Sequence, residues 1–206
     1  MIKAIITDFD GTLVDTFEAN LRAYQKAFYE VGITLTAEKY RECFGYRFDR
    51  FMTAMGVTDE NVAAQIKELK KQYYPEYFEF LKPNTALINL IAGIKSMGGK
   101  TAIASTARKE NLMNAVNYLS IAHHFDLIFA GVDVKKGKPD PEIYLKSMAA
   151  LGVSPDETLI FEDSQVGIDA AKASGASYMI VDQRQFCLWE KGEERKEKRH
   201  GYRICF

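Results

Sequence analysis

The chain has 206 residues, of which 47% are hydrophobic and 27% are charged, and its formal net charge is −1. This length and composition are typical of a globular protein with one domain and an inserted subdomain. The near-neutral charge excludes an electrostatic basis for binding nucleic acid or an acidic membrane.

The three cysteines are far apart and form no CxxC pair. This spacing favours free thiols in a reducing compartment over disulfides or a zinc site. The longest apolar run, residues 86–94 (ALINLIAGI), is too short to span a bilayer. Acidic residues follow the N-terminal apolar run too closely for a signal peptide. We therefore expect a cytoplasmic monomer that binds no nucleic acid and no membrane.

The first elements are a strand and a series of helices. Residues 2–7 (IKAIIT) are rich in β-branched side chains and predict a buried strand. Apolar residues then recur at steps of four and three along one face of an amphipathic helix: Phe17, Leu21, Tyr24, Phe28 and Val31. Helical patterning continues in three further stretches: 37–44, 49–56 and 60–80. No strand is predicted between residues 17 and 82.

After Pro83 the pattern changes to an alternation of helices and strands. The predicted strands are short apolar runs: 101–105, 126–131, 158–163 and 178–181. The predicted helices alternate with them: 87–97, 109–119, 140–151 and 165–174. Such an alternation predicts a parallel sheet that helices cover on both faces.

A long helical stretch thus separates the first strand from the others, and we infer an insertion. The expected fold is α/β, with a Rossmann-like parallel sheet core of residues 1–15 and 83–206. Residues 16–82 would form an inserted all-helical cap. The segment 190–203 (EKGEERKEKRHGYR) mixes both signs of charge and predicts a solvated helix face or tail. The sequence defines no role for residues 183–206.

Polar side chains follow four of the predicted strands, at the point where each strand ends or in the loop after it. In open parallel sheets, ligands bind beyond the carboxyl ends of the strands, so these side chains should meet at one edge. In chain order they are Asp8 and Asp10, Ser105 and Thr106, Lys138, and Glu162 and Asp163.

This set of side chains is suited to phosphoryl transfer. Asp8 and Asp10 should lie on the same side of an extended strand, because side chains alternate with a period of two. One carboxylate could attack phosphorus while the other handles a proton on the leaving oxygen. Gly11 would let the backbone turn tightly around the incoming group.

A cation would be needed among so many carboxylates, since they repel one another. Asp8, Glu162 and Asp163 offer hard oxygen ligands that are suited to Mg²⁺. Lys138, together with the two hydroxyls after the second strand, would bind the phosphoryl oxygens and offset their developing charge.

Each motif alone also has a purely structural interpretation. An Asp-Gly pair is a common turn, and a Ser-Thr pair after a strand is often a helix cap. Residues 137–140 (GKPD) could be a plain loop and residues 162–164 (EDS) a capping segment. The functional interpretation therefore depends on the order of the four motifs and on their shared edge.

Two other binding motifs fail on inspection. A calcium loop counted from Asp8 needs glycine and glutamate at the positions of Leu13 and Ala19. A P-loop counted from Gly131 has its two glycines too far apart, and Pro139 replaces the Ser or Thr that would hold magnesium.

In content and order the four motifs resemble the haloacid dehalogenase-like (HAD) superfamily. The branch most resembled is that of β-phosphoglucomutase and phosphoglycolate phosphatase, which has a helical cap after the first strand. Residues 8–16 (DFDGTLVDT) match the first motif and residues 104–107 (ASTA) the second. The lysine of KKGKPDPEIY matches the third, and residues 161–176 (FEDSQVGIDAAKASGA) match the fourth. The similarity extends from residue 2 to about residue 181.

This resemblance implies a Mg²⁺-dependent phosphatase. Asp8 would be the nucleophile that forms an aspartyl-phosphate. Asp10 would protonate the leaving alcohol and then activate the hydrolytic water. Lys138 and Ser105 would bind the phosphoryl group, and Thr12 would support the loop. The implied Mg²⁺ ligands are Asp8, the main-chain carbonyl of Asp10, Glu162 and Asp163.

The cap is expected to select the substrate, because it would close over the site and exclude water. The candidate contacts are polar residues of the cap and one core loop: Asn20, Arg47, Arg50 and Arg108. Mutases of this branch have a histidine at the position of Asn20, and phosphoglycolate phosphatases have Thr-Asn-Lys in the second motif. These differences favour a phosphatase for another small phosphorylated metabolite. A β-phosphoglucomutase-like mutase and a non-catalytic phosphate-binding protein stay open as alternatives.

Overall fold

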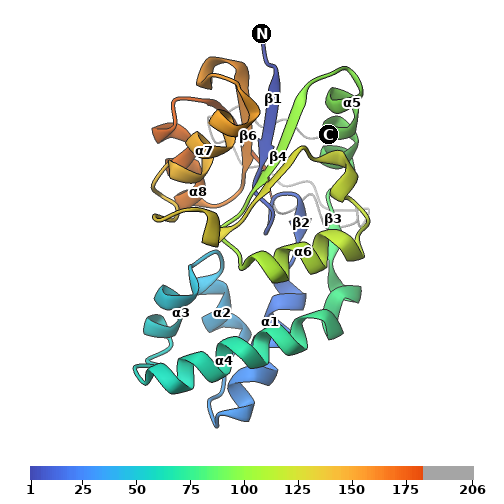
Figure 1. The fold of residues 1–206 in the computed structure, drawn as a ribbon. Helices are drawn as coiled ribbons and strands as arrows, with labels where there is room; N and C mark the ends of the chain where they lie inside the picture. The colour runs from blue at the N-terminus through green and yellow to red at the C-terminus, as the bar shows by residue number, and fades with distance from the viewer. Residues whose placement is uncertain (183–206) are drawn as a thin grey trace, which may run out of the picture.

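The computed structural model describes residues 1–182, so the interpretation of residues 183–206 lies outside the described residues (Figure 1). Its centre is a sheet of five parallel strands in the order β5-β4-β1-β6-β7. The strands are β1 (Ala4–Thr7), β4 (Lys100–Ala104), β5 (Leu127–Phe129), β6 (Thr158–Glu162) and β7 (Ser177–Ile180). Because the chain passes from β1 to β4 on one side and later to β6 on the other, the strand order reverses beside β1. Ligand sites of open parallel sheets lie at such a reversal.

Helices cover both faces of this sheet. On one face, α5 (Thr85–Ser96) and α6 (Lys109–Tyr118) pack with Ile5 of β1 in one hydrophobic cluster. On the other face, α7 (Glu142–Leu151) and α8 (Gln165–Ala173) pack with Ile6. The neighbouring residues Ile5 and Ile6 pack on opposite faces of the sheet, because successive side chains of a strand point to opposite sides. The predicted fold class, an α/β protein with a parallel sheet between helices, is confirmed.

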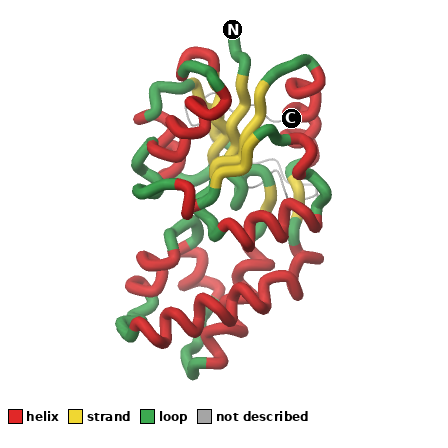
Figure 2. The backbone as a smooth tube through the Cα atoms, in the orientation of Figure 1, coloured by secondary structure: helices red, strands yellow, loops and turns green. Residues whose placement is uncertain are grey.

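A second body of helices lies beyond the carboxyl ends of the strands (Figures 1 and 2). It consists of α1 (Phe17–Glu30), α2 (Ala37–Cys43), α3 (Phe48–Ala54), α4 (Glu60–Tyr73) and the 3₁₀ helix η1 (Tyr74–Phe80). We call residues 17–80 the helical segment. Its core is largely a separate hydrophobic cluster, in which aromatic rings of Tyr24, Phe28 and Phe51 pack edge to face or tilted.

The helix predicted over residues 60–80 is divided in the structure. The α-helix α4 ends at Tyr73, and η1 continues the chain with Pro75 in its first turn. Proline has no N–H to donate to the preceding turn, and its ring clashes with that turn's carbonyl. The periodicity of the apolar residues persists through this break, and so the pattern alone did not reveal it.

Two short strands connect the helical segment to the sheet, and the sequence pattern predicted neither of them. β2 (Val14–Asp15) pairs antiparallel with β3 (Lys82–Pro83). Asn84 reinforces this junction, since its N–H donates to the carbonyl of Leu13 over 2.9 Å. Two residues are too few for a recognisable period-two pattern. The two chain connections between the sheet and the helical segment thus run side by side. The predicted boundaries between core and cap, at residues 15/16 and 82/83, stay a prediction.

The remaining helical turns are the 3₁₀ elements η2 (Ala122–His124), η3 (Gly131–Asp133) and η4 (Pro155–Glu157). Within residues 1–182, no helix has the length and hydropathy needed to cross a membrane.

Replacing Phe28 by alanine should destabilise the protein strongly. The Phe28 ring is fully buried, whereas the next side chain, Tyr29, is 81% exposed. We expect Phe28→Ala to lower the free energy of unfolding by about 3–5 kcal/mol, because it leaves a cavity in the core of the helical segment. Tyr29→Ala should change it by no more than about 0.5 kcal/mol. Urea unfolding followed by circular dichroism measures both, and equal losses would contradict this packing.

Candidate active site

The loop that follows β1 is held in place by main-chain hydrogen bonds. The N–H of Asp8 donates to the carbonyl of Phe161 over 3.0 Å, which extends the pairing of β1 with β6. Gly11 has a φ of +89°, a conformation that glycine adopts without strain. Its N–H donates to the carbonyl of Val14 over 2.8 Å and closes the turn. Gly11 therefore shapes the loop that presents Asp8 and Asp10.

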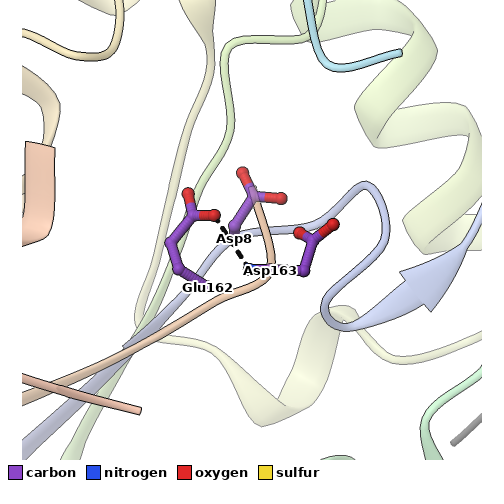
Figure 3. A group of neighbouring side chains, drawn as sticks. All are labelled: Asp8, Glu162 and Asp163. Carbon is purple, nitrogen blue, oxygen red and sulfur yellow. Dashed lines mark hydrogen bonds between the residues drawn. The ribbon is translucent and has the colours of Figure 1, made fainter. Parts of the chain in front are cut away.

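Three carboxylates meet at the carboxyl ends of β1 and β6. One oxygen each of Asp8, Glu162 and Asp163 lie within 4.8 Å of one another. Figure 3 shows these side chains gathered in one space, from two segments far apart in the sequence. The hydroxyl of Thr12 donates to Asp163 over 2.6 Å and orients it. A cluster of carboxylate oxygens is the donor set that hard divalent cations such as Mg²⁺ prefer.

Lys138 balances part of this negative charge. Its Nζ donates to Oδ1 of Asp8 over 2.6 Å and to Oε1 of Glu162 over 2.5 Å. All three side chains are almost completely buried, and Lys138 reaches them from the loop before α7. Paired buried charges stabilise one another only with such close geometry and additional hydrogen bonds.

The electrostatics of the cluster follow from burial and from this pairing. Burial lowers the pKa of Lys138, but the carboxylates of Asp8 and Glu162 outweigh it and hold that pKa well above its usual value. Burial raises the pKa of Glu162, but Lys138 and other donors outweigh burial and lower it. For Asp8, burial and the other carboxylates outweigh Lys138 and raise the pKa. One ammonium therefore does not balance the cluster, and a divalent cation would favour ionised Asp8.

Asp10 connects the sheet edge to the helical segment. Its Oδ1 accepts from the hydroxyl of Thr16 over 2.5 Å and from Nδ2 of Asn20 over 3.3 Å. Its Oδ2 accepts from the hydroxyl of Ser105 over 3.5 Å. Because Thr16 and Asn20 lie at the start of α1, the position of the Asp10 carboxylate depends on that helix.

A cavity of about 140 Å³ lies between the sheet edge and the helical segment. Nine of the residues predicted for the site line it: Asp8, Asp10, Asn20, Arg47, Ser105, Thr106, Arg108, Lys138 and Asp163. The other four lie outside its wall: Gly11, Thr12, Arg50 and Glu162. The structure thus brings residues of all four motifs and of the helical segment to one cavity.

The three arginines predicted to contact a substrate differ in their surroundings. The guanidinium of Arg50 stacks on the ring of Tyr46, at 3.9 Å from its centre. Tyr46 lines the cavity, whereas Arg50 itself does not. Arg108 donates to the carbonyl of Lys67 over 3.1 Å and to the carboxylate of Glu68 over 3.1 Å, and so joins α6 to α4. Arg47 lies against Gly137, next to Lys138. Arg47 and Arg108 therefore bridge the two sides of the cavity.

Sequence reasoning missed several residues of this wall, Lys70 above all. Lys70 is buried in α4, and its Nζ lies 3.6 Å from the ring centre of Tyr74 and 5.3 Å from that of Tyr24. Burial lowers the pKa of Lys70 to about 7, although Asp10 acts in the opposite direction. The available signal was its position four residues after the buried Ile66, on the inner face of the helix.

A second missed residue is Asn111 of α6, which also lines the cavity. Its Oδ1 is the single buried side-chain oxygen or nitrogen without a hydrogen-bond partner in the described part of the chain. Such groups in native proteins are usually satisfied by water or by a ligand.

Comparisons with known proteins agree on one family for this chain. Residues 5–181 match the family model of the haloacid dehalogenase-like hydrolases. A "phosphorylated carbohydrates phosphatase" of Thermotoga maritima is 32% identical over 180 residues, covering 84% of this chain and 82% of that protein. A beta-phosphoglucomutase of Bacillus subtilis is 28% identical over 194 residues, covering 89% and 85% of the two chains.

A similar solved structure is that of CbbY from Rhodobacter sphaeroides in complex with phosphate. It superposes with a TM-score of 0.79 at 28% sequence identity, covering 94% of this chain and 90% of that one. The similarity thus includes both the sheet and the helical segment.

Replacing Lys70 by methionine should stabilise the protein in a pH-dependent way. Between pH 7 and 10.5 the unfolded chain keeps the Lys70 proton while the folded protein loses it, so the wild-type protein becomes more stable as pH rises. Below pH 7 the folded protein carries the full cost of a buried ammonium. Lys70→Met should therefore gain most stability at about pH 6, and its advantage should shrink by more than about 1 kcal/mol at about pH 9. Urea unfolding at both pH values measures this, and an unchanged difference would contradict the environment described for Lys70.

Proposed function

The chain belongs to the haloacid dehalogenase-like hydrolase family, and we propose that it hydrolyses a small phosphorylated metabolite through an aspartyl-phosphate at Asp8. Its general class is that of a phosphoric monoester hydrolase, in agreement with the phosphatases among its relatives. The observation that carries the finer proposal is the pairing of buried Asp8 with Lys138 beside Asp163, at the wall of the cavity.

The first half of the reaction would transfer the phosphoryl group to the protein. A carboxylate oxygen of Asp8 attacks phosphorus, and the bond from phosphorus to the ester oxygen breaks. Asp10 gives its proton to that oxygen, so the product leaves as an alcohol. Lys138 and Ser105 bind the phosphoryl oxygens and offset the charge that develops on them.

The second half would return the protein to its starting state. Asp10, now ionised, takes a proton from a water molecule, and the resulting hydroxide attacks phosphorus. The bond to Asp8 breaks, inorganic phosphate leaves, and Asp10 is protonated again. Contacts with Thr16 and Asn20 hold the Asp10 carboxylate close to this space in both halves.

We further propose Mg²⁺ as the cofactor. The carboxylates of Asp8 and Asp163 and the main-chain carbonyl of Asp10 would hold it, with Glu162 as the third carboxylate of the cluster. When bound, the cation would offset the negative charge of the phosphoryl group. The donor set fits, because it is made of oxygens and its carboxylates outnumber the one ammonium of Lys138.

The helical segment would act as a cap that encloses the substrate and excludes water. We propose the division into a core of residues 1–15 and 83–206 and a cap of residues 16–82, since β2 and β3 pair at the junction. Lys70 and Arg47 on the cap side would favour a polar or anionic substrate. Phosphorylated sugars are the first class to test, given the name of the T. maritima relative.

A sugar-phosphate mutase is the second candidate, because the B. subtilis relative is a beta-phosphoglucomutase. Incubation with a hexose 1-phosphate and the corresponding bisphosphate distinguishes the two functions. Release of inorganic phosphate without formation of the isomer supports the phosphatase, whereas isomer formation supports the mutase. A non-catalytic binding protein would bind phosphate without either product.

Asp8→Asn should abolish turnover while leaving the fold intact. Asparagine has nearly the same shape but is a poor nucleophile, so we expect hydrolysis of an aryl phosphate to fall about a thousandfold or more. A matched control is Asp169→Asn, which changes an exposed carboxylate of α8 whose hydrogen-bond partner within residues 1–182 is Gln165. Full activity of Asp8→Asn would disprove the assignment of the nucleophile.

Removal of the divalent cation by a chelator should reversibly inhibit the same hydrolysis. Excess EDTA should stop hydrolysis by the wild-type protein, and added Mg²⁺ should restore it, because the carboxylate cluster would lose and then regain its cation. Hydrolysis that continues at the full rate in EDTA would contradict the proposed cofactor.

A further inference from the structure

Glu162 is the most enclosed carboxylate of the cluster. It is fully buried and, unlike Asp8 and Asp163, it does not line the cavity. Its Oε1 accepts from Nζ of Lys138 over 2.5 Å and from the hydroxyl of Tyr144 over 2.7 Å. Its Oε2 accepts from the N–H of Asp163 and from the N–H and hydroxyl of Ser164, over 3.0–3.2 Å.

These contacts leave Glu162 little capacity for a cation. A carboxylate offers about four lone-pair positions, and five donors already approach this one. A cation bound directly to Glu162 would have to displace Lys138, Tyr144 or a main-chain N–H. Asp8 and Asp163 have no such enclosure, since both line the cavity.

The second donor to Oε1, Tyr144, comes from the same stretch of chain as Lys138. It lies in the first turn of α7, is fully buried, and its ring centre is 5.0 Å from Nζ of Lys138. Its hydroxyl thus fixes the oxygen that Lys138 also uses. Lys138 in turn places the same Nζ 2.6 Å from Asp8.

The backbone of α8 also packs against the Glu162 carboxylate. A Cβ added to Gly167 would overlap the Glu162 carboxylate, so only glycine leaves room for it. The carboxylate is therefore enclosed by Lys138 and Tyr144, by the main chain that follows β6, and by α8.

We propose that Tyr144 is a positioning residue that acts through Glu162. Its hydrogen bond fixes the carboxylate that holds Lys138 against Asp8. Glu162 then serves as the anchor of Lys138, and the cation is held by Asp8, Asp163 and the carbonyl of Asp10. This inference rests on the proposed function, because it assigns Lys138 to the phosphoryl group.

Tyr144→Phe tests the positioning role, since it removes only the hydroxyl. We expect the affinity for inorganic phosphate, measured by calorimetry in Mg²⁺, to fall about tenfold or more, as for the loss of a hydrogen bond to a charged group. The kcat/KM for an aryl phosphate should fall by a similar factor, while the Kd for Mg²⁺ stays within about twofold. A wild-type phosphate affinity and kcat/KM, or an equal loss of Mg²⁺ affinity, would overturn the proposal.

Ser147→Ala is the matched control. Ser147 lies one turn further along α7, is equally buried, and its hydroxyl donates only to the carbonyl of Ile143 over 2.8 Å. Its removal should leave phosphate and Mg²⁺ affinities unchanged, which separates the role of Tyr144 from a general effect on α7. Equal losses of phosphate affinity in the two variants would overturn the proposal.

Two acidic substitutions test the role of Glu162. Glu162→Gln should weaken phosphate binding but leave the Mg²⁺ Kd within about threefold, whereas Asp163→Asn should raise that Kd about tenfold or more. Equal losses of Mg²⁺ affinity would overturn the anchor role. Calorimetry needs no turnover, so a wild-type protein that binds Mg²⁺ and phosphate without hydrolysis would refute the proposed function alone.

Gly167→Ala provides a variant that displaces Glu162 without removing any polar group. The added methyl overlaps the carboxylate, so phosphate affinity should fall about tenfold or more, as for Tyr144→Phe. Gly93→Ala is its control, because a Cβ there in α5 has no atom of another part of residues 1–182 within 4 Å. Gly167→Ala with wild-type phosphate affinity would overturn the enclosure described for Glu162.

Discussion

The contact of one buried ammonium with two buried carboxylates organises this protein. Lys138 lies between Asp8 and Glu162, at 2.6 and 2.5 Å, where solvent does not screen the charges. Each charge alone would be costly to bury, and the group is tolerable only because its members are paired and hydrogen-bonded. The Tyr144 hydroxyl, the main chain after β6 and the glycine of α8 complete this pairing.

The parallel sheet explains how distant parts of the chain meet in this group. β1 and β6 are neighbours, so Asp8 and Glu162 are brought to one edge although they are far apart in the sequence. The strand order reverses beside β1, which opens the space that the helical segment covers. Asp10 belongs to both parts, because its carboxylate is bonded to Thr16 and Asn20 at the start of α1. Any motion of that helix would therefore change the position of Asp10.

Much of this arrangement was predictable from the sequence, because the physical rules involved are local. Alternating helices and strands predict a parallel sheet, and the residues that follow its strands must share an edge. Asp8, Lys138 and Asp163 were found in this way. β2 and β3 were missed because two residues carry no periodicity, and the end of α4 was missed because the apolar pattern continues past Pro75.

The site residues that the sequence did not predict were missed for another reason: their burial depends on tertiary packing. A lysine on a helix is usually solvated, and nothing local shows that Lys70 lies under α1 and η1 against Tyr24 and Tyr74. Tyr144 likewise reads as an apolar position of α7, and only the structure reveals its bond to Glu162. The contact of Arg50 also depends on tertiary packing, since its guanidinium stacks on Tyr46, which lines the cavity, while Arg50 itself does not.

The balance of charge at Lys138 can be measured directly with a double-mutant cycle of unfolding free energies. The cycle compares the wild-type protein, Lys138→Met, Asp8→Asn and the double variant in EDTA at about pH 8. Lys138→Met should lower the free energy of unfolding by about 3–5 kcal/mol, because it leaves buried carboxylates unpaired. The double variant should regain much of that loss, since Asp8→Asn removes one of the unpaired charges. Strictly additive effects of the two substitutions would contradict the account, because they would show that Lys138 and Asp8 do not stabilise each other.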